Sequence, residues 1–103
     1  MSKVKVLATY NTDHHGMNNI DLYDGKYYFF ELSKDCKKND FSALGNLPYK
    51  YKLKITYKGK TAIAMKAGVG PCDKNHAKIA IHITLARYLG IKNDLEYVYI
   101  EKA

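Results

Sequence analysis

The chain has 103 residues, of which 47% are hydrophobic, and it carries 17 Lys and Arg against 10 Asp and Glu. This length allows one compact domain over residues 1–103 and excludes two, and the hydrophobic fraction excludes a disordered chain. The basic excess indicates attraction to polyanions such as nucleic acid or an anionic cell-wall polymer. Because Arg87 is the one arginine, we expect no specific nucleic-acid recognition.

Short strands dominate the first half of the sequence. Residues 3–10 alternate small apolar residues with lysine and leucine, which predicts a half-buried strand. A polar loop follows over residues 11–25, and the aromatic run KYYFFEL at 26–32 predicts a second strand. Residues 33–46 are polar, and 40–45 have the N-cap aspartate and the closing glycine of a single helical turn.

The second half begins with a predicted hairpin. Residues 51–57 and 61–65 flank the tight turn Lys58-Gly59-Lys60, and the Gly-Val-Gly-Pro of residues 68–71 predicts a loop. Residues 78–81 then predict a short buried strand, 83–89 a helix that ends at Gly90, and 95–100 a last strand. Six or seven strands with one or two short helices favour a small closed barrel, because closure removes exposed strand edges.

Three segments in this order carry a resemblance to a known family. They are ATYNTDHHG near the start, LPYKYKLKITYKGKTAIAMKAGVGP in the middle and KIAIHITLARYLGI after it. Together they resemble the double-psi β-barrel domains of the rare lipoprotein A, expansin and barwin-like superfamily, over about Lys5 to Ile100. The resemblance implies a mainly β fold, a six-stranded double-psi β-barrel, with a shallow groove that holds glycan or a protein partner.

The sequence departs from the lytic and expansin-like relatives at the residues that carry their chemistry. Where those relatives have an aspartate two residues before Gly-Pro, this chain has Gly68. Their aspartate in the later strand is replaced by Ala80, and their serine at the helix entry by His82, which we expect to cap the helix. A general acid for glycosidic cleavage must carry a proton, which neither Gly68 nor Ala80 can do. We therefore predict no catalytic residue.

The predicted ligand-binding groove combines polar residues after the first strand with aromatic and glycine-loop residues. Its members are Tyr10, Asp13, His14, Tyr49, Gly68, Val69 and His82. The ten tyrosines leave two interpretations open, an exposed platform that stacks on sugar rings and simple filling of the core. For the platform we considered Tyr10, Tyr23, Tyr27, Tyr28, Tyr49, Tyr51 and Tyr57.

The remaining side-chain chemistry points to no cofactor. Adjacent His14 and His15 point opposite ways in extended chain, and no third ligand follows at metal-binding spacing, so we expect no metal site. Cys36 and Cys72 are candidates for one disulfide, although free thiols remain the alternative. No apolar run reaches the roughly 18 residues that a membrane span needs.

These observations leave three functional hypotheses. The first is a non-catalytic, expansin-like domain that grips cell-wall polysaccharide or peptidoglycan, and the second is an inhibitor of papain-like cysteine proteases acting through residues 11–19 and 68–76. The third, a lytic enzyme with displaced carboxylates, has the least support, because no pair of carboxylates has the expected spacing. We expect a monomer that is secreted or associated with the cell wall, while a cytoplasmic protein stays an alternative.

Overall fold

Six strands and one short helix make up the regular structure of the residues described. The computed structural model describes residues 3–16, 19–32, 47–70 and 77–103. Its elements, in chain order, are β1 (Val4–Asn11), β2 (Tyr28–Leu32), β3 (Lys52–Tyr57), β4 (Lys60–Gly70), β5 (Ile79–His82), α1 (Ile83–Leu89) and β6 (Glu96–Lys102). The helical turn expected over 40–45 lies outside the described residues.

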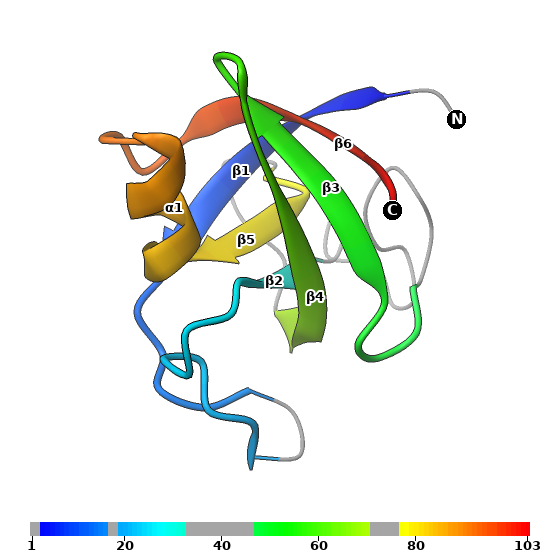
Figure 1. The fold of residues 1–103 in the computed structure, drawn as a ribbon, viewed down its shortest axis with the longest axis vertical. Helices are drawn as coiled ribbons and strands as arrows, with labels where there is room; N and C mark the ends of the chain where they lie inside the picture. The colour runs from blue at the N-terminus through cyan, green and yellow to red at the C-terminus, as the bar shows by residue number, and fades with distance from the viewer. Residues whose placement is uncertain (1–2, 17–18, 33–46, 71–76) are drawn as a thin grey trace.

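The strands close into a barrel in the order β1-β5-β2-β4-β3-β6, with β6 returning to β1 (Figure 1). Two pairs are parallel, β1 with β5 and β2 with β4, and the other four neighbours are antiparallel. The expectation of a mainly β fold, a closed six-stranded barrel with a short helix, is confirmed. Closure leaves every strand with two neighbours, so no sheet edge is exposed.

The hairpin of β3 and β4 forms where the sequence predicts it. Tyr57 pairs with Lys60, so Lys58 and Gly59 alone make the turn. Both residues have positive φ, 46° and 85°. A two-residue hairpin turn with positive φ at both positions has a twist that matches the twist of the flanking strands. Glycine takes this conformation freely, whereas Lys58 adopts it under strain.

The prediction of a loop over residues 68–71 is wrong for Gly68 to Gly70. These residues continue β4, because parallel pairing with β2 places Phe30 beside Gly68 and Leu32 beside Gly70. The register shifts between Phe29 and Phe30, which marks a bulge at this point. The glycines therefore belong to the barrel wall, while Pro71 lies outside the described residues.

Apolar side chains pack in two clusters, one inside the barrel and one on its outside. The larger cluster takes alternate residues from all six strands, such as Val6, Phe29, Leu53, Ile79 and Val98, together with Leu85, Ala86 and Leu89 of α1. The smaller cluster contains Leu22, Tyr28, Phe30, Leu32, Ala67, Ala77 and Ala80. Because β2 supplies buried residues to both clusters, all five of its residues are buried.

Helix α1 begins and ends as its sequence predicts. The His82 side chain accepts a hydrogen bond from the backbone N–H of Thr84, which confirms His82 as the N-cap. Gly90 ends the helix in the left-handed conformation, with φ 82°. The short helix therefore follows β5 without a connecting loop, and its cap is set by a strand residue of the barrel.

Candidate binding groove

A groove of about 260 Å³ lies across four neighbouring strands of the barrel, β1, β5, β2 and β4. Its lining among the described residues is Thr9, Tyr10, Asn11, Asp13, Phe30, Leu32, Val69 and Ala80. Three of the predicted groove residues, Tyr10, Asp13 and Val69, therefore lie together in it. Apolar side chains form much of this surface, and the polar groups come from the end of β1 and the residues that follow.

Strand register brings distant parts of the sequence into one row at this groove. Thr9 of β1 pairs with Ala80 of β5, and Ala80 pairs with Phe30 of β2. Phe30 pairs in turn with Gly68 of β4. Gly68 and Ala80 therefore lie on either side of Phe30.

Asn11 lines the groove, and part of its side chain is buried. Its side-chain oxygen is shielded from solvent and has no hydrogen-bond partner among the residues that the structure describes. A buried acceptor of this kind typically costs about 1–3 kcal/mol of stability until a partner satisfies it.

Carboxylates occur at the groove's rim. Asp13 lines the groove and is exposed. Asp94, which is also exposed, accepts a hydrogen bond of 2.6 Å from the Thr9 hydroxyl. The arrangement therefore gives a ligand polar contacts at the rim, around a floor whose described residues carry no carboxylate.

His82 fixes the position of Asp13 and is itself fully buried. Its Nδ1 accepts from the Thr84 N–H, so its Nε2 donates to the Asp13 carbonyl oxygen, 2.8 Å away. This pair of bonds requires the neutral ring with the proton on Nε2. His82, a predicted groove residue, therefore acts on the groove indirectly, through its hydrogen bond to the backbone of Asp13.

His14 belongs to a cluster of three rings with Tyr23 and His82. Its ring centroid is 5.1 Å from that of Tyr23, and the Tyr23 and His82 rings are in a T-shaped arrangement with centroids 4.6 Å apart. The Tyr23 hydroxyl also donates to the carbonyl oxygen of Thr12. These contacts join the segment after β1 to the start of α1, which positions Asp13 at the rim.

The same segment is held against the barrel further along. The space beside Gly16 is filled by Ala67, whose carbonyl oxygen would lie 2.8 Å from a side-chain carbon at position 16. At the other end of the segment, the Tyr28 hydroxyl donates to Asp24 at 2.7 Å. Burial is the main cause that raises the pKa of Tyr28 to about 12, and this hydrogen bond is the second. The same bond lowers the pKa of Asp24.

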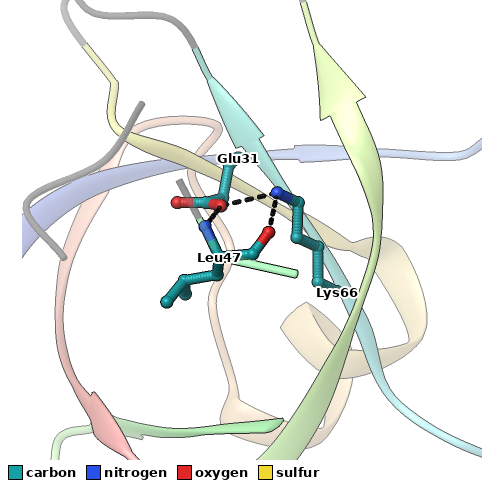
Figure 2. Close-up of polar contacts among 3 residues, drawn as sticks. All are labelled: Glu31, Leu47 and Lys66. Atoms are coloured by element: carbon teal, nitrogen blue, oxygen red, sulfur yellow. Dashed lines mark hydrogen bonds and ion pairs between the residues drawn. The ribbon is translucent and has the colours of Figure 1, made fainter. Parts of the chain in front are cut away.

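Glu31 belongs to the strand between two groove residues but its side chain pairs elsewhere (Figure 2). One carboxylate oxygen lies 2.7 Å from Lys66 Nζ and accepts at 2.7 Å from the backbone N–H of Leu47. Lys66 also donates to the Leu47 carbonyl oxygen. Both charged side chains are buried, at 0% and 4% exposure. Glu31 therefore serves as an internal brace that ties β2, β4 and residue 47 together.

The other predicted site residues lie apart from the groove or outside the described residues. Gly68 is buried in β4 beside Phe30. Tyr49 is not among the described lining residues, and Lys50 Nζ lies 5.7 Å from the centroid of its ring. Cys36 and Cys72 both fall outside the described residues.

Sequence reasoning missed several groove residues, namely Thr9, Asn11, Phe30 and Leu32. A signal for Phe30 and Leu32 is their alternation with Phe29 and Glu31 in KYYFFEL, which puts them on the opposite side of β2. This alternation does not appear in the burial of β2, because the residues on both sides of the strand are buried. Thr9 and Asn11 become recognisable only when β1 is placed beside β5.

The tyrosines divide between packing and exposure in a way the sequence left open. Tyr28 and Tyr57 are buried, whereas the exposed tyrosines of the described residues are Tyr23, Tyr88, Tyr97 and Tyr99. Three of these four were not among the candidates for a platform. The alternation of β6, in which Val98 and Ile100 are buried, is the signal that identifies Tyr97 and Tyr99.

Comparison with protein families and curated proteins does not identify a family for this chain. No protein-family model matches the chain, and no curated protein matches it. The described side chains contain no group of three or more His, Cys, Asp or Glu that could hold a metal ion. Among the described helical residues, no helix is long and apolar enough to cross a membrane.

Proposed function

We propose that this protein is a non-catalytic binding domain that grips cell-wall polysaccharide or peptidoglycan in the groove. The observation that carries the proposal is the groove lining, in which the apolar side chains of Leu32, Val69 and Ala80 lie beside the polar ones of Thr9, Asn11 and Asp13. Binding sites for small ligands and chain segments combine such an apolar surface with a few well-placed polar groups. A sugar ring presents the same combination, with apolar C–H faces and hydroxyls at its edge.

The groove offers complementary contacts to each part of a sugar. Val69, 44% exposed, and Tyr10 supply apolar surface for the C–H face of a ring. Asp13 offers a carboxylate for hydroxyl groups, at the rim that His82 fixes. Because the polar groups lie at one end of β1 and the apolar ones on β2 and β4, a glycan segment would run across the strands.

The proposed absence of catalytic activity is based on the two residues that pair with Phe30, namely Gly68 and Ala80. In lytic relatives of the double-psi family that the sequence resembles, the acids occupy the places of Gly68 and Ala80. Register puts both places beside Phe30, which lines the groove together with Ala80. Ala80 is 6% exposed and has no group that can give up a proton, so the proposed role is holding glycan.

The test is retention on insoluble cell-wall material, with matched variants of one strand. Val69 lines the groove and Ile63 does not, yet both are in β4 and have similar exposure, 44% and 46%. We expect Val69→Gln to weaken retention about fivefold, equivalent to about 1 kcal/mol, and Ile63→Gln to leave it unchanged. Retention through the groove should persist as salt is raised, since screening weakens only the charge attraction.

Two results would refute this function. If the wild-type protein is not retained even at low salt, the groove does not hold wall glycan. If both glutamine variants lose retention equally, binding does not take place in the groove. Release of soluble fragments from the wall by the wild-type protein, lost in Asp13→Asn, would instead identify a lytic enzyme.

A further inference from the structure

The half of the barrel that faces away from the groove carries exposed aromatic side chains. Strands β1, β6, β3 and β4 are neighbours here, and β6 presents Tyr97 and Tyr99 at 57% and 45% exposure. Ile63 of β4 is exposed on the same half, at 46%. We call this surface the lysine-tyrosine face, defined by Lys5, Lys52, Lys54, Ile63, Tyr97 and Tyr99.

Lysines lie next to these rings by strand register. Lys5 of β1 pairs with Tyr99, and its Nζ lies 5.0 Å from the centroid of the Tyr97 ring. On the other side of β6, Lys54 pairs with Glu101, and their side chains form an ion pair of 3.6 Å. Strands β1, β3 and β6 contain two acidic residues, Glu96 and Glu101. Because lysines outnumber them, this face has net positive charge.

A hollow of about 250 Å³ adjoins the same face. Lys26, Tyr27, Lys52, Ile63 and Met65 line it. Two ammonium groups beside an aromatic ring form a site suited to a phosphate attached to a planar or apolar group. Lys52 and Ile63 belong both to this hollow and to the lysine-tyrosine face, so the two are continuous.

We propose that the lysine-tyrosine face binds single-stranded nucleic acid without sequence preference. Such proteins combine lysines that follow the phosphates with exposed aromatic rings on which bases stack. Tyr97 and Tyr99 are two residues apart on one strand, so their Cα atoms are about 6.8 Å apart along it. This is about twice the 3.4 Å rise of stacked bases in a duplex, and it fits bases that are unstacked from one another.

The same features argue against polyphosphate as the principal ligand. Polyphosphate would use the lysines but would gain no stacking from the exposed rings. Duplex DNA hides the faces of its bases within the stack. Lysine, unlike arginine, contacts phosphate as a point charge without a fixed fork, which agrees with binding that ignores sequence.

The test is fluorescence anisotropy of a labelled oligothymidylate of about 12 nucleotides, with the full chain. We expect binding at low salt, and we expect Tyr97→Ala and Tyr99→Ala each to weaken it about 5-fold to 100-fold. Tyr88→Ala, which removes a ring of 47% exposure in α1, outside this face, should leave it unchanged. Lys5→Gln should lower the slope of affinity against salt by about one.

Inorganic polyphosphate as competitor separates base stacking from charge attraction. If the proposal holds, both tyrosine variants bind polyphosphate as the wild type does while losing oligothymidylate. If the wild type does not bind oligothymidylate, or if neither tyrosine variant weakens binding, the proposal is wrong. Val69→Gln should leave this binding intact, so failure here is distinguishable from failure of glycan binding in the groove. Circular dichroism confirms that each variant folds.

Discussion

Replacing Lys66 by methionine should destabilise the barrel strongly. The change keeps a side chain of similar length but removes the ammonium group that lies 2.7 Å from the Glu31 carboxylate. Because the Glu31 side chain is 0% exposed, water cannot take the place of the lost charge. Breaking a buried ion pair by removing one partner typically costs about 3–5 kcal/mol.

That loss is large against the stability of a domain of this size. Folded domains are stable by about 5–15 kcal/mol in total, so Lys66→Met removes at least about a fifth of that stability. In a domain of about 100 residues, each kcal/mol shifts the Tm by about 4–8 °C. We therefore expect the Tm to fall by at least about 12 °C. Urea unfolding followed by circular dichroism measures the free energy directly, and tyrosine emission is a second probe because the chain has no tryptophan.

A double variant separates the electrostatic cost from the loss of packing. Glu31→Gln combined with Lys66→Met removes both charges and keeps an oxygen that can accept from the Leu47 N–H. If the loss of the Lys66 charge beside the buried Glu31 carboxylate causes the instability, the double variant is more stable than Lys66→Met alone. A double variant that is no more stable than the single one, or a Lys66→Met protein with wild-type stability, would refute the reasoning.

Three further changes test local features of the fold. Gly16→Ala should destabilise by about 1–3 kcal/mol, because the added carbon would lie 2.8 Å from the carbonyl oxygen of Ala67; an unchanged urea midpoint would contradict this close packing. Lys58→Gly should raise stability by up to about 1 kcal/mol, since it relieves a positive φ of 46° in the hairpin turn, and a lower midpoint would show that the lysine itself stabilises the turn. Burial raises the pKa of Tyr28 from 10.0 to about 12, so the folded state holds this proton more tightly than the unfolded chain, and the associated stability is complete below about pH 10 and is lost as pH rises towards 12. Tyr28→Phe should lack that loss between pH 10 and 12, and equal pH dependence of the two proteins in urea unfolding would contradict it.

Local sequence patterns predict most elements of this fold. Alternation of period two identifies β1 and β3, and the Lys58-Gly59 turn identifies the hairpin, because each depends on residues a few positions apart. The helix over residues 83–89 is likewise predicted together with its cap and its glycine stop. These signals give the class of fold as a small closed barrel.

Patterns of this kind fail where a distant strand decides the outcome. Gly68 and Gly70 have the local character of a loop, yet they extend β4 because β2, more than 30 residues earlier in the chain, offers them parallel hydrogen bonds. Exposure of Tyr97 and Tyr99 follows from alternation, but their position between the lysines of β1 and β3 depends on how β6 pairs with both.

The sequence by itself therefore determined the local elements, the basic charge and the absence of an acid at residues 68 and 80. Only the tertiary structure decided that these two positions flank Phe30 in one row of the barrel, and that Glu31 and Lys66 meet in its interior. The physical reason is that strand register is set by side-chain packing and hydrogen bonds between segments far apart in the chain. A period-two pattern shows which side of a strand is buried, but it does not show which strand lies beside it.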